Sequence, residues 1–357
     1  MKILVLQHKK IGDVLLSSII CNNLRNLIPH AEIHYLINKE AFPVVQGNPS
    51  IDRVITLNPE HRASARTFIK LILQIRREHY DVVIDAYTKL ESWLIVMFCA
   101  AKRRISYKKK YRTFLYTDNL SREAVKVTQH GRIIDLKLLL IQPFLNGTLL
   151  ERHPQIHLAE EEKLQAAVLF KTYRIPNRKN LMLNVIGSCP LKTYPLEYMA
   201  TLINEITARV DVNILFNFLP HQKEDAQKLY TLCNPLARKN IFLELANYDL
   251  RMFIAIMSQC DAIIGNEGGA IHIAKAFNKP SFTIFSPWIT KQEWSTFEDG
   301  VHHVAVHLSD FKTDLYENTP ETEFKEKALE LFRELKPEFI LPKLNIYLTR
   351  HFGGEMP

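Results

Sequence analysis

The strongest constraint on the fold is an alternation of short apolar runs with segments of helical apolar spacing, which occurs twice along the chain. A continuous apolar run is typical of a strand buried on both faces, and strand–helix alternation predicts a mostly parallel sheet. In the first half, strands are expected at 2–7, 32–38, 52–58 and 81–87, and helices at 14–29, 66–80 and 92–102, with a short helix and turn at 42–51.

The alternation is expected to break at residues 102–112 and to resume after a linker-like segment at 151–158. The second set predicts strands at 180–188, 212–220, 261–266 and 281–287, and helices at 196–209, 223–233, 250–260 and 270–277. A chain of 357 residues is too long for one ordinary core. We therefore expect an α/β protein with two Rossmann-like domains, residues 1–155 and 156–357.

Composition narrows the functional class. The sequence has no run of 18 uncharged apolar residues, and its apolar start is too short for a signal-peptide core, so a cytoplasmic protein is expected. Five widely spaced cysteines are typical of reduced core thiols rather than of a zinc site. The net charge of +8 suggests an anionic partner, either nucleic acid, a phosphorylated lipid or a nucleotide.

The first of three strand-to-helix loops with candidate chemistry is HKKIGD, residues 8–13. Gly12 permits a tight turn and the close approach of a ligand. Asp13 lies at a predicted helix start, where it serves either as a cap or as a general base for an attacking hydroxyl. Lys9 and Lys10 add positive charge here, either as solvated surface residues or as part of a site.

The second loop follows the strand predicted at 180–188. Gly187 and Ser188 lie at its exit, and Lys192 precedes a helix whose first turn suits Pro195. A lysine at the positive end of a helix favours either a nearby anion or exposure to water.

The third loop lies within IIGNEGGAIHIAKAF, residues 263–277, which holds three glycines in five positions. Glycines at a strand exit expose backbone N–H groups, and the following helix directs its positive end at the same place. His272 in the first helical turn either donates to a phosphate oxygen or packs against the sheet. Neither GxGxxG nor a P-loop is present, so a dehydrogenase or a Walker-type ATPase is poorly supported.

Together the loops place a candidate base in the first domain and a candidate diphosphate site in the second. This arrangement fits group transfer from a nucleotide-activated donor across an interdomain cleft.

Over nearly its whole length the sequence resembles glycosyltransferase family 9, the lipopolysaccharide heptosyltransferases. The resemblance is carried by the opening MKILVLQHKKIGDVLL, by LKTYPLEYMATLINEI, and most specifically by CDAIIGNEGGAIHIAKAFNKPSFTIFSP. It implies a GT-B fold, with two facing Rossmann-like domains of parallel sheets around a cleft. The N-terminal domain would bind the acceptor and the C-terminal domain the nucleotide sugar, and the C-terminal helix can pack back on the N-terminal domain.

The family implies an inverting, metal-independent transfer of a sugar, typically heptose from ADP-L-glycero-D-manno-heptose, onto a lipopolysaccharide core or lipid A acceptor. No cofactor is expected beyond the nucleotide-sugar substrate. By this resemblance Asp13 matches the proposed base and Lys192 a lysine that contacts the donor phosphates, and these are the predicted catalytic residues. The predicted donor-binding residues are Gly187, Ser188, Lys192, Glu224, Glu267, Gly268, Gly269 and His272.

The tract KRRISYKKKYR, residues 102–112, carries seven basic side chains and is either a solvated loop or a docking surface for an anionic glycolipid. Peripheral contact with the cytoplasmic face of the inner membrane is expected. Nucleic acid is not expected as a partner, because no nucleic-acid motif is present. The predicted acceptor-binding residues are Lys10, Gly12, Arg62, Arg66, Arg104, Lys108 and Lys109.

The sequence departs from the family pattern around the donor. Glu267-Gly268 stand where relatives usually have Asp-Ser/Thr, and either Gln222 or Glu224 takes the place of an acidic residue near the ribose. These changes bear on which sugar nucleotide is used. Two alternatives remain at this point, a sugar-nucleotide epimerase on the same scaffold and a non-catalytic module that binds anionic glycolipid or nucleotide.

Overall fold

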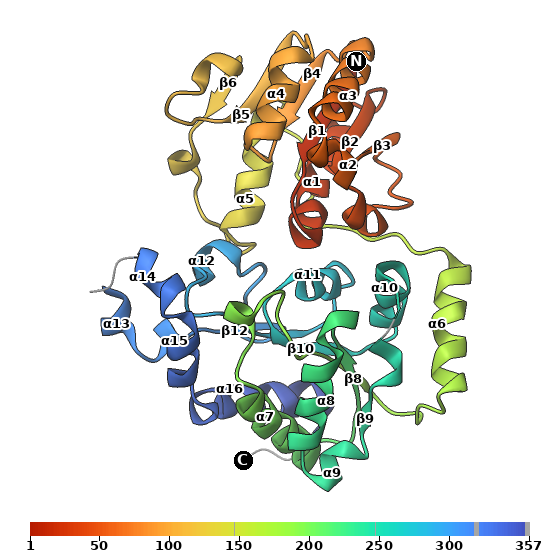
Figure 1. Cartoon of the computed structure of the whole chain (residues 1–357), viewed down its shortest axis with the longest axis vertical. Helices are drawn as coiled ribbons and strands as arrows, with labels where there is room; N and C mark the ends of the chain where they lie inside the picture. The colour runs from red at the N-terminus through yellow and green to blue at the C-terminus, as the bar shows by residue number, and fades with distance from the viewer. Residues whose placement is uncertain (146, 247, 318–320, 354–357) are drawn as a thin grey trace. The chain divides into compact units, whose positions relative to one another are not determined.

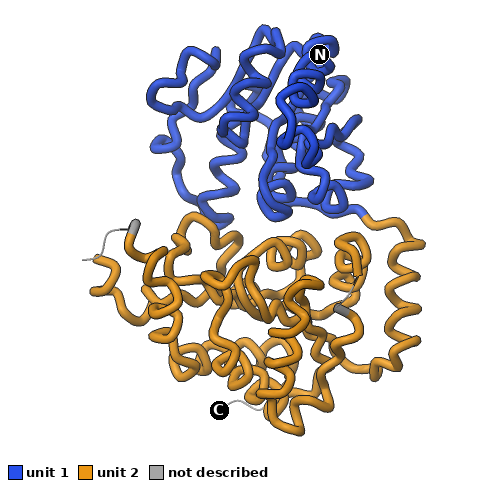
Figure 2. Tube along the Cα trace, viewed as in Figure 1, with its two compact units in different colours: residues 1–157 blue, residues 158–357 orange. Residues whose placement is uncertain are grey.

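The computed structural model describes residues 1–145, 147–246, 248–317 and 321–353. The chain divides into two compact units, residues 1–157 and 158–357 (Figure 2), where the sequence suggested a boundary at 155/156. Each unit is built around a six-stranded sheet with helices on both sides (Figure 1).

In unit 1 (residues 1–157) the strand order is β3-β2-β1-β4-β5-β6, and all neighbouring strands are parallel. This is the order of a Rossmann fold. The strands are β1 (Lys2–Gln7), β2 (Glu32–Asn38), β3 (Arg53–Leu57), β4 (Val82–Asp85), β5 (Arg103–Tyr107) and β6 (Asp118–Leu120). The helices are α1 (Ile11–Leu27), α2 (Pro59–Ala63), α3 (Ala65–Arg77), α4 (Leu90–Phe98) and α5 (Arg132–Leu139).

The core of unit 1 explains why its first strand reads as a continuous apolar run. In β1 the side chains from Ile3 to Leu6 are completely buried, because helices cover both faces of the central strand. The inner faces of α3 and α4 share one apolar cluster with β1 and β4, in which Leu71, Ile75 and Ile95 are buried.

The expected break at 102–112 is wrong. Residues 103–107 form β5, and β6 pairs with it, so the sheet continues through the basic tract. Ile105 and Tyr107 are buried in this strand, while the side chains of Arg103 and Arg104 lie at its start and reach the surface. The basic residues around it made this strand hard to predict from the sequence, because only Ile105, Ser106 and Tyr107 are buried.

In unit 2 (residues 158–357) the order is β12-β11-β10-β7-β8-β9, which repeats the arrangement of unit 1 with β7 in the place of β1. The strands are β7 (Asn180–Asn184), β8 (Asn213–Asn217), β9 (Ile241–Phe242), β10 (Ala262–Asn266), β11 (Ser281–Ile284) and β12 (His303–Val306). The helices are α6 (Glu160–Thr172), α7 (Leu196–Arg209), α8 (Lys223–Leu232), α9 (Pro235–Arg238), α10 (Leu250–Ser258), α11 (Gly269–Ala276), α12 (Lys291–Trp294), α13 (Thr313–Glu317), α14 (Glu321–Glu326), α15 (Ala328–Glu334) and α16 (Pro337–Phe352).

The last helix belongs to the core of unit 2. α16 packs against α7, and Ile340, Leu344, Tyr347 and Leu348 are buried in the same apolar cluster as β7 and β10. The Tyr347 ring meets Phe282 of β11 edge-on, with ring centroids 5.6 Å apart. Among the described residues, none of the helices is both long and apolar enough to cross a membrane.

The direction of the strands determines which loops lie together at one edge of each sheet. Because the strands are parallel, the loops that follow β1, β4 and β5 leave the same edge of one sheet, and those that follow β7 and β10 leave the same edge of the other. All five cysteines are free thiols, and four of them are buried, as the sequence predicted.

Candidate active site

In unit 1, Asp13 lies in the first turn of α1, directly beyond the carboxyl end of β1. The N-cap position is Lys10, so Asp13 is not the residue that caps the helix. Its carboxylate Oδ1 lies 3.7 Å from Nζ of Lys9, and its side chain is 15% exposed. A carboxylate that is partly exposed at a helix N-terminus is accessible to an incoming hydroxyl, as a general base must be.

Lys137 is a second cation near Asp13, and the sequence analysis missed it. It is buried on α5, which packs against α1. Burial lowers the pKa of Lys137 to about 8, and the negative charge of Asp13 opposes that shift. A lone lysine in the apolar stretch IIDLKLLLI was the only available signal.

His8 also lies at this strand end, and it is fully buried with its ring 5.0 Å from that of Tyr87. Neither ring nitrogen has a hydrogen-bond partner among the described residues. Burial, assisted by the charge of Arg62, lowers the pKa of His8 to about 3, so the ring is neutral. Arg62 Nη2 donates to the His8 carbonyl (3.3 Å) and to Asn38 Oδ1 (2.7 Å), which places this predicted acceptor residue beside the segment that leads into α1, where Gly12 and Asp13 lie.

Lys109 follows β5 and reaches back to the neighbouring strand end. Its Nζ donates to the Thr88 carbonyl at 3.3 Å. Burial lowers the pKa of Lys109, and the charges of Lys89, Arg112 and Arg122 lower it further. Several cations therefore converge beyond β4 and β5, which is an environment that an anionic group would stabilise.

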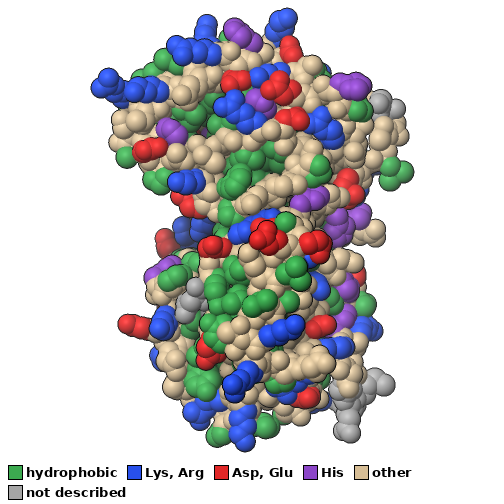
Figure 3. Space-filling model, turned by 90° about the vertical axis from the view of Figure 1, so that its right-hand side faces the viewer, with side chains coloured by type: hydrophobic (Ala, Val, Ile, Leu, Met, Phe, Trp, Pro, Cys, Tyr) green, Lys and Arg blue, Asp and Glu red, His purple; other side chains and the backbone are tan. Residues whose placement is uncertain are grey.

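The other predicted acceptor residues are dispersed. Arg104 donates to the carbonyls of Leu115 (2.8 Å) and Ala101 (3.0 Å), so its guanidinium braces the entry to β5 and lies away from the strand's carboxyl end. Lys10 and Lys108 are exposed, and Arg66 lies on the solvent face of α3. In the view of Figure 3, Lys and Arg side chains are spread over both units with Asp and Glu among them.

In unit 2, the glycine-rich turn between β10 and α11 has the backbone that its sequence suggested. Gly265 has φ +134°, and a Cβ there would lie 2.4 Å from the Asn184 carbonyl oxygen on β7. Gly268 caps α11 with φ +156°, a conformation that is almost restricted to glycine. α11 then begins at Gly269, so its free N–H groups and positive dipole end lie at this turn.

Lys192 meets this turn from the neighbouring strand. It ends a short 3₁₀ helix (Pro190–Lys192) beyond β7, and its Nζ lies 2.6 Å from Glu267 Oε1. The same Nζ lies 5.5 Å from the ring centroid of Trp288, whose indole N–H donates to the Leu191 carbonyl (3.2 Å). Ser286 Oγ donates to that carbonyl at 2.6 Å. The segment FSP, residues 285–287, therefore fixes the position of the short helix that carries Lys192.

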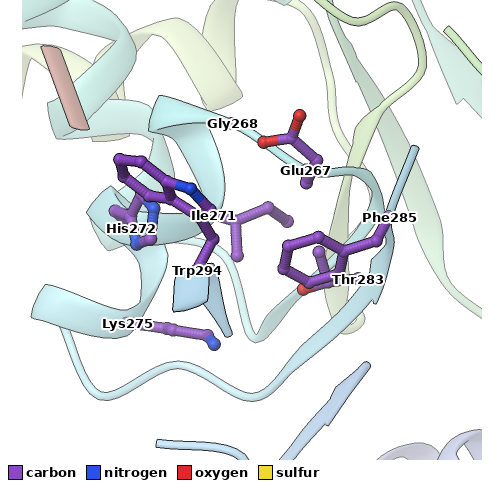
Figure 4. A pocket seen from close by; sticks show the side chains of 8 residues that line it. All are labelled: Glu267, Gly268, Ile271, His272, Lys275, Thr283, Phe285 and Trp294. Atoms are coloured by element: carbon purple, nitrogen blue, oxygen red, sulfur yellow. The ribbon is translucent and has the colours of Figure 1, made fainter. Parts of the chain in front are cut away.

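Beneath the turn is a small open hollow. Figure 4 shows its lining around the start of α11, with the Glu267 carboxylate on one side and the Lys275 ammonium on the other. The residues that line it are Glu267, Gly268, Ile271, His272, Lys275, Thr283, Phe285 and Trp294.

Two polar atoms that line this hollow can each form a further hydrogen bond. His272 Nδ1 and Thr283 Oγ1 are buried without a hydrogen-bond partner among the described residues. Burial lowers the pKa of His272 to about 3, and the charges of Lys275 and Lys192 act in the same direction, so its imidazole is neutral. Burial also lowers the pKa of Lys275 to about 8, and its Nζ donates to the Thr296 carbonyl.

Other predicted donor residues have different surroundings. A Cβ at Gly187 would lie 2.2 Å from the Lys192 carbonyl oxygen, so this glycine lets two backbone segments pack together. Gln222 donates to the Gly187 carbonyl (2.8 Å) and is buried, whereas Glu224 and Ser188 are exposed. Among the described residues, no group of three His, Cys, Asp or Glu side chains is arranged to hold a metal ion.

Unit 1 thus has a partly exposed carboxylate beyond β1, and unit 2 has a glycine turn, a lysine and a histidine beyond β7 and β10. Residues 68–326 match the sequence profile of Glycosyltransferase family 9 (heptosyltransferase). The chain belongs to this family, and the predicted GT-B fold and glycosyltransferase activity are thereby confirmed.

Similarity to known proteins extends over most of the chain. The lipopolysaccharide heptosyltransferase 1 of Campylobacter coli is 22% identical over 291 residues, which is 80% of this chain and 84% of that protein. A family 9 glycosyl transferase structure from Veillonella parvula superposes with a TM-score of 0.74 at 17% identity and covers 97% of each chain. The ADP-heptose lipopolysaccharide heptosyltransferase II structure of Escherichia coli has a TM-score of 0.68 at 18% identity, with 94% of this chain and 99% of that one covered.

Proposed function

We propose that this glycosyltransferase moves a heptose from ADP-heptose onto a lipopolysaccharide core or lipid A acceptor, with inversion and without a metal ion. Relatives that span most of the chain are named as lipopolysaccharide heptosyltransferases, which supports this donor and acceptor over the epimerase alternative. The proposal assigns the base to unit 1 and the leaving group to unit 2.

The observation that carries the proposal is the donor turn of unit 2. Lys192 Nζ, the backbone amides at Gly268 and Gly269, and the N-terminus of α11 lie together at one strand edge. These groups can stabilise the negative charge that grows on a departing diphosphate. The neutral His272 supplies an N–H donor without a charge of its own, and its unpartnered Nδ1 lies at the same hollow.

Asp13 takes the proton of the acceptor hydroxyl as that oxygen attacks the anomeric carbon from the face opposite the diphosphate. The glycosidic bond forms while the bond to the diphosphate oxygen breaks, and ADP leaves with the electron pair. The carboxylate is partly exposed, as a base that meets an acceptor hydroxyl must be, and Lys9 lies 3.7 Å from it.

The acceptor is proposed to bind beyond β1, β4 and β5 of unit 1. Arg62 and Lys109 lie at adjoining strand ends, and Lys89, Arg112 and Arg122 add positive charge near Lys109. An anionic glycolipid head group matches this environment, and we place the reaction at the cytoplasmic face of the inner membrane because such an acceptor is lipid-linked.

The direct test is to incubate the purified chain with ADP-heptose and a heptose-free lipid A–core acceptor, and to follow the acceptor by mass spectrometry. Addition of one heptose residue is expected. Epimerised sugar nucleotide formed without acceptor would instead favour an epimerase. If no sugar nucleotide is consumed with any lipopolysaccharide precursor, the chain is a binding module and the proposal is wrong.

A further inference from the structure

The outer face of α3 and α4 in unit 1 is apolar although it is exposed. Leu90 is 62% exposed and Ile69 is 55% exposed, and exposed apolar side chains that form one contiguous patch are typical of an interaction surface. We name this surface the α3–α4 face, and its exposed apolar residues are Ile69, Leu73, Leu90, Met97, Phe98 and Phe114.

These residues form one surface because the elements that carry them are in contact. α3 packs beside α4, and their inner sides share a core cluster (Figure 1). Arg76 Nη1 on α3 donates to the Phe98 carbonyl at the end of α4 (3.3 Å). On the other side of α4, the Arg112 guanidinium lies 3.1 Å above the Trp93 ring, next to the 3₁₀ turn Thr113–Leu115 that holds Phe114.

The same face carries positive charge and little negative charge. The sequence of α3, ARTFIKLILQIRR, has four basic residues and no acidic residue, and α4 contributes only Glu91. Arg66, Lys70, Arg76 and Arg77 are all exposed, and none of them forms an ion pair with another described residue. An amphipathic surface with apolar and basic side chains side by side is typical of proteins that lie on an anionic bilayer.

We propose that the α3–α4 face docks on an anionic lipid surface, with its apolar side chains in the interfacial region and its basic side chains at the head groups. The proposal rests on the proposed function, because docking on lipid would bring unit 1 to an acceptor that is itself lipid-linked. It differs from docking through the basic tract 102–112, where Arg103 pairs with Asp118 and Arg104 bonds to backbone within the fold.

The test is co-sedimentation of the full chain with vesicles of phosphatidylglycerol and phosphatidylcholine, in parallel with vesicles of phosphatidylcholine alone. The wild type is expected to bind the anionic vesicles and to be released by high salt. The double variant Leu90→Gln/Met97→Gln should bind at least about tenfold more weakly, because two apolar side chains lose their burial in lipid. Both positions are exposed, so the fold does not depend on them.

The matched control is Leu164→Gln/Val168→Gln on α6 of unit 2, where the two apolar side chains are also exposed, at 65% and 58%. This variant should bind like the wild type. The proposal is overturned if the wild type does not bind anionic vesicles, or if the control loses as much binding as the test variant. It is also overturned if light scattering shows a wild-type dimer that Leu90→Gln/Met97→Gln makes monomeric, since the face would then join two copies.

Transfer assays separate this proposal from the proposed function. With acceptor in anionic vesicles, Leu90→Gln/Met97→Gln should lower the transfer rate, whereas with detergent-solubilised acceptor the rate should equal that of the wild type. Vesicle binding is measured without any acceptor or donor. A failed transfer assay would therefore not affect the evidence for lipid docking, and a failed vesicle-binding assay would not affect the evidence for heptose transfer.

Discussion

The Nζ atom of Lys192 lies 2.6 Å from Oε1 of Glu267, at the turn where β10 passes into α11. Both side chains are largely covered, with Glu267 only 11% exposed. The ion pair fixes the lysine ammonium beside the N–H groups of the glycine turn. An incoming diphosphate would find the Lys192 ammonium already in position. The diphosphate would, however, compete with the Glu267 carboxylate for that ammonium.

Removing the lysine should reduce catalysis strongly. For Lys192→Ala we expect kcat/KM to fall by about a hundredfold, equivalent to about 3 kcal/mol of transition-state stabilisation. Lys163, whose Nζ also lies 2.6 Å from a carboxylate (Glu160), provides the control on α6. Steady-state kinetics of Lys163→Ala should match the wild type, and equal loss in both variants would exclude a special role for Lys192.

Glu267 should oppose diphosphate binding through its charge. In Glu267→Gln the side chain keeps its shape but no longer neutralises Lys192, so ADP should bind about tenfold more tightly, a gain of about 1.4 kcal/mol. ADP lacks the sugar, so calorimetric titration with ADP isolates the diphosphate contact. Weaker binding of ADP by this variant would show that the carboxylate supports the phosphate site instead.

Gly265 should tolerate no side chain. In Gly265→Ala the new Cβ would lie 2.4 Å from the Asn184 carbonyl oxygen at φ +134°, so the free energy of unfolding should fall by about 3 kcal/mol or more. Gly300→Ala is the control, because its φ is +71° and nothing lies within 4 Å of the added carbon. Urea unfolding of both variants gives the comparison. A loss at Gly265 no greater than that at Gly300 would argue against close contact between β7 and β10 there.

His272, whose Nδ1 is covered, should make the protein less stable in mild acid. Its folded-state pKa of about 3 lies below the ordinary value of 6.5, so on acidification the unfolded chain takes up a proton that the folded chain does not. Stability from this residue is complete above pH 6.5 and is lost as the pH falls toward 3. Between pH 7 and pH 5 it should cost about 2 kcal/mol, at 1.4 kcal/mol per pH unit.

The measurement is the free energy of unfolding of the wild type and of His272→Gln at both pH values. The variant should lose about 2 kcal/mol less than the wild type between them, because His8 and His307 contribute equally to both proteins. Identical pH dependence would mean that the imidazole takes up a proton as readily in the folded protein as in the unfolded chain, which would contradict a pKa lowered by its surroundings.

Periodicity predicted most of the sheet, because both central strands are buried on two faces and read as apolar runs. It failed at β5, where Arg103 and Arg104 interrupt the apolar run at the strand's start and only the second half is covered. It also did not identify α6, whose sequence EEEKLQAAVLFKT buries only Ala166 completely and so has no clear apolar stripe. In such segments the tertiary contacts, which sequence periodicity does not contain, decide the structure.

The site was only partly predictable for a similar reason. Gly268, Gly269 and His272 are close in sequence and form one turn, so their pattern was visible. Thr283 and Trp294 reach the same hollow from β11 and α12, and Lys275 reaches it from the far end of α11. Gln222, which with Glu224 was considered near the donor ribose, donates to the Gly187 carbonyl, a contact between loops that the sequence does not reveal.

The most direct test of the central claim compares heptose transfer by the wild type and by Asp13→Asn, with ADP affinity measured on the same preparations. The account predicts that the wild type adds one heptose to the lipid A–core acceptor. It also predicts that the asparagine variant is slower by about a hundredfold or more while binding ADP equally well, because the residues proposed to bind the donor lie in unit 2. Transfer by Asp13→Asn at the wild-type rate would contradict the assignment of Asp13 as the base.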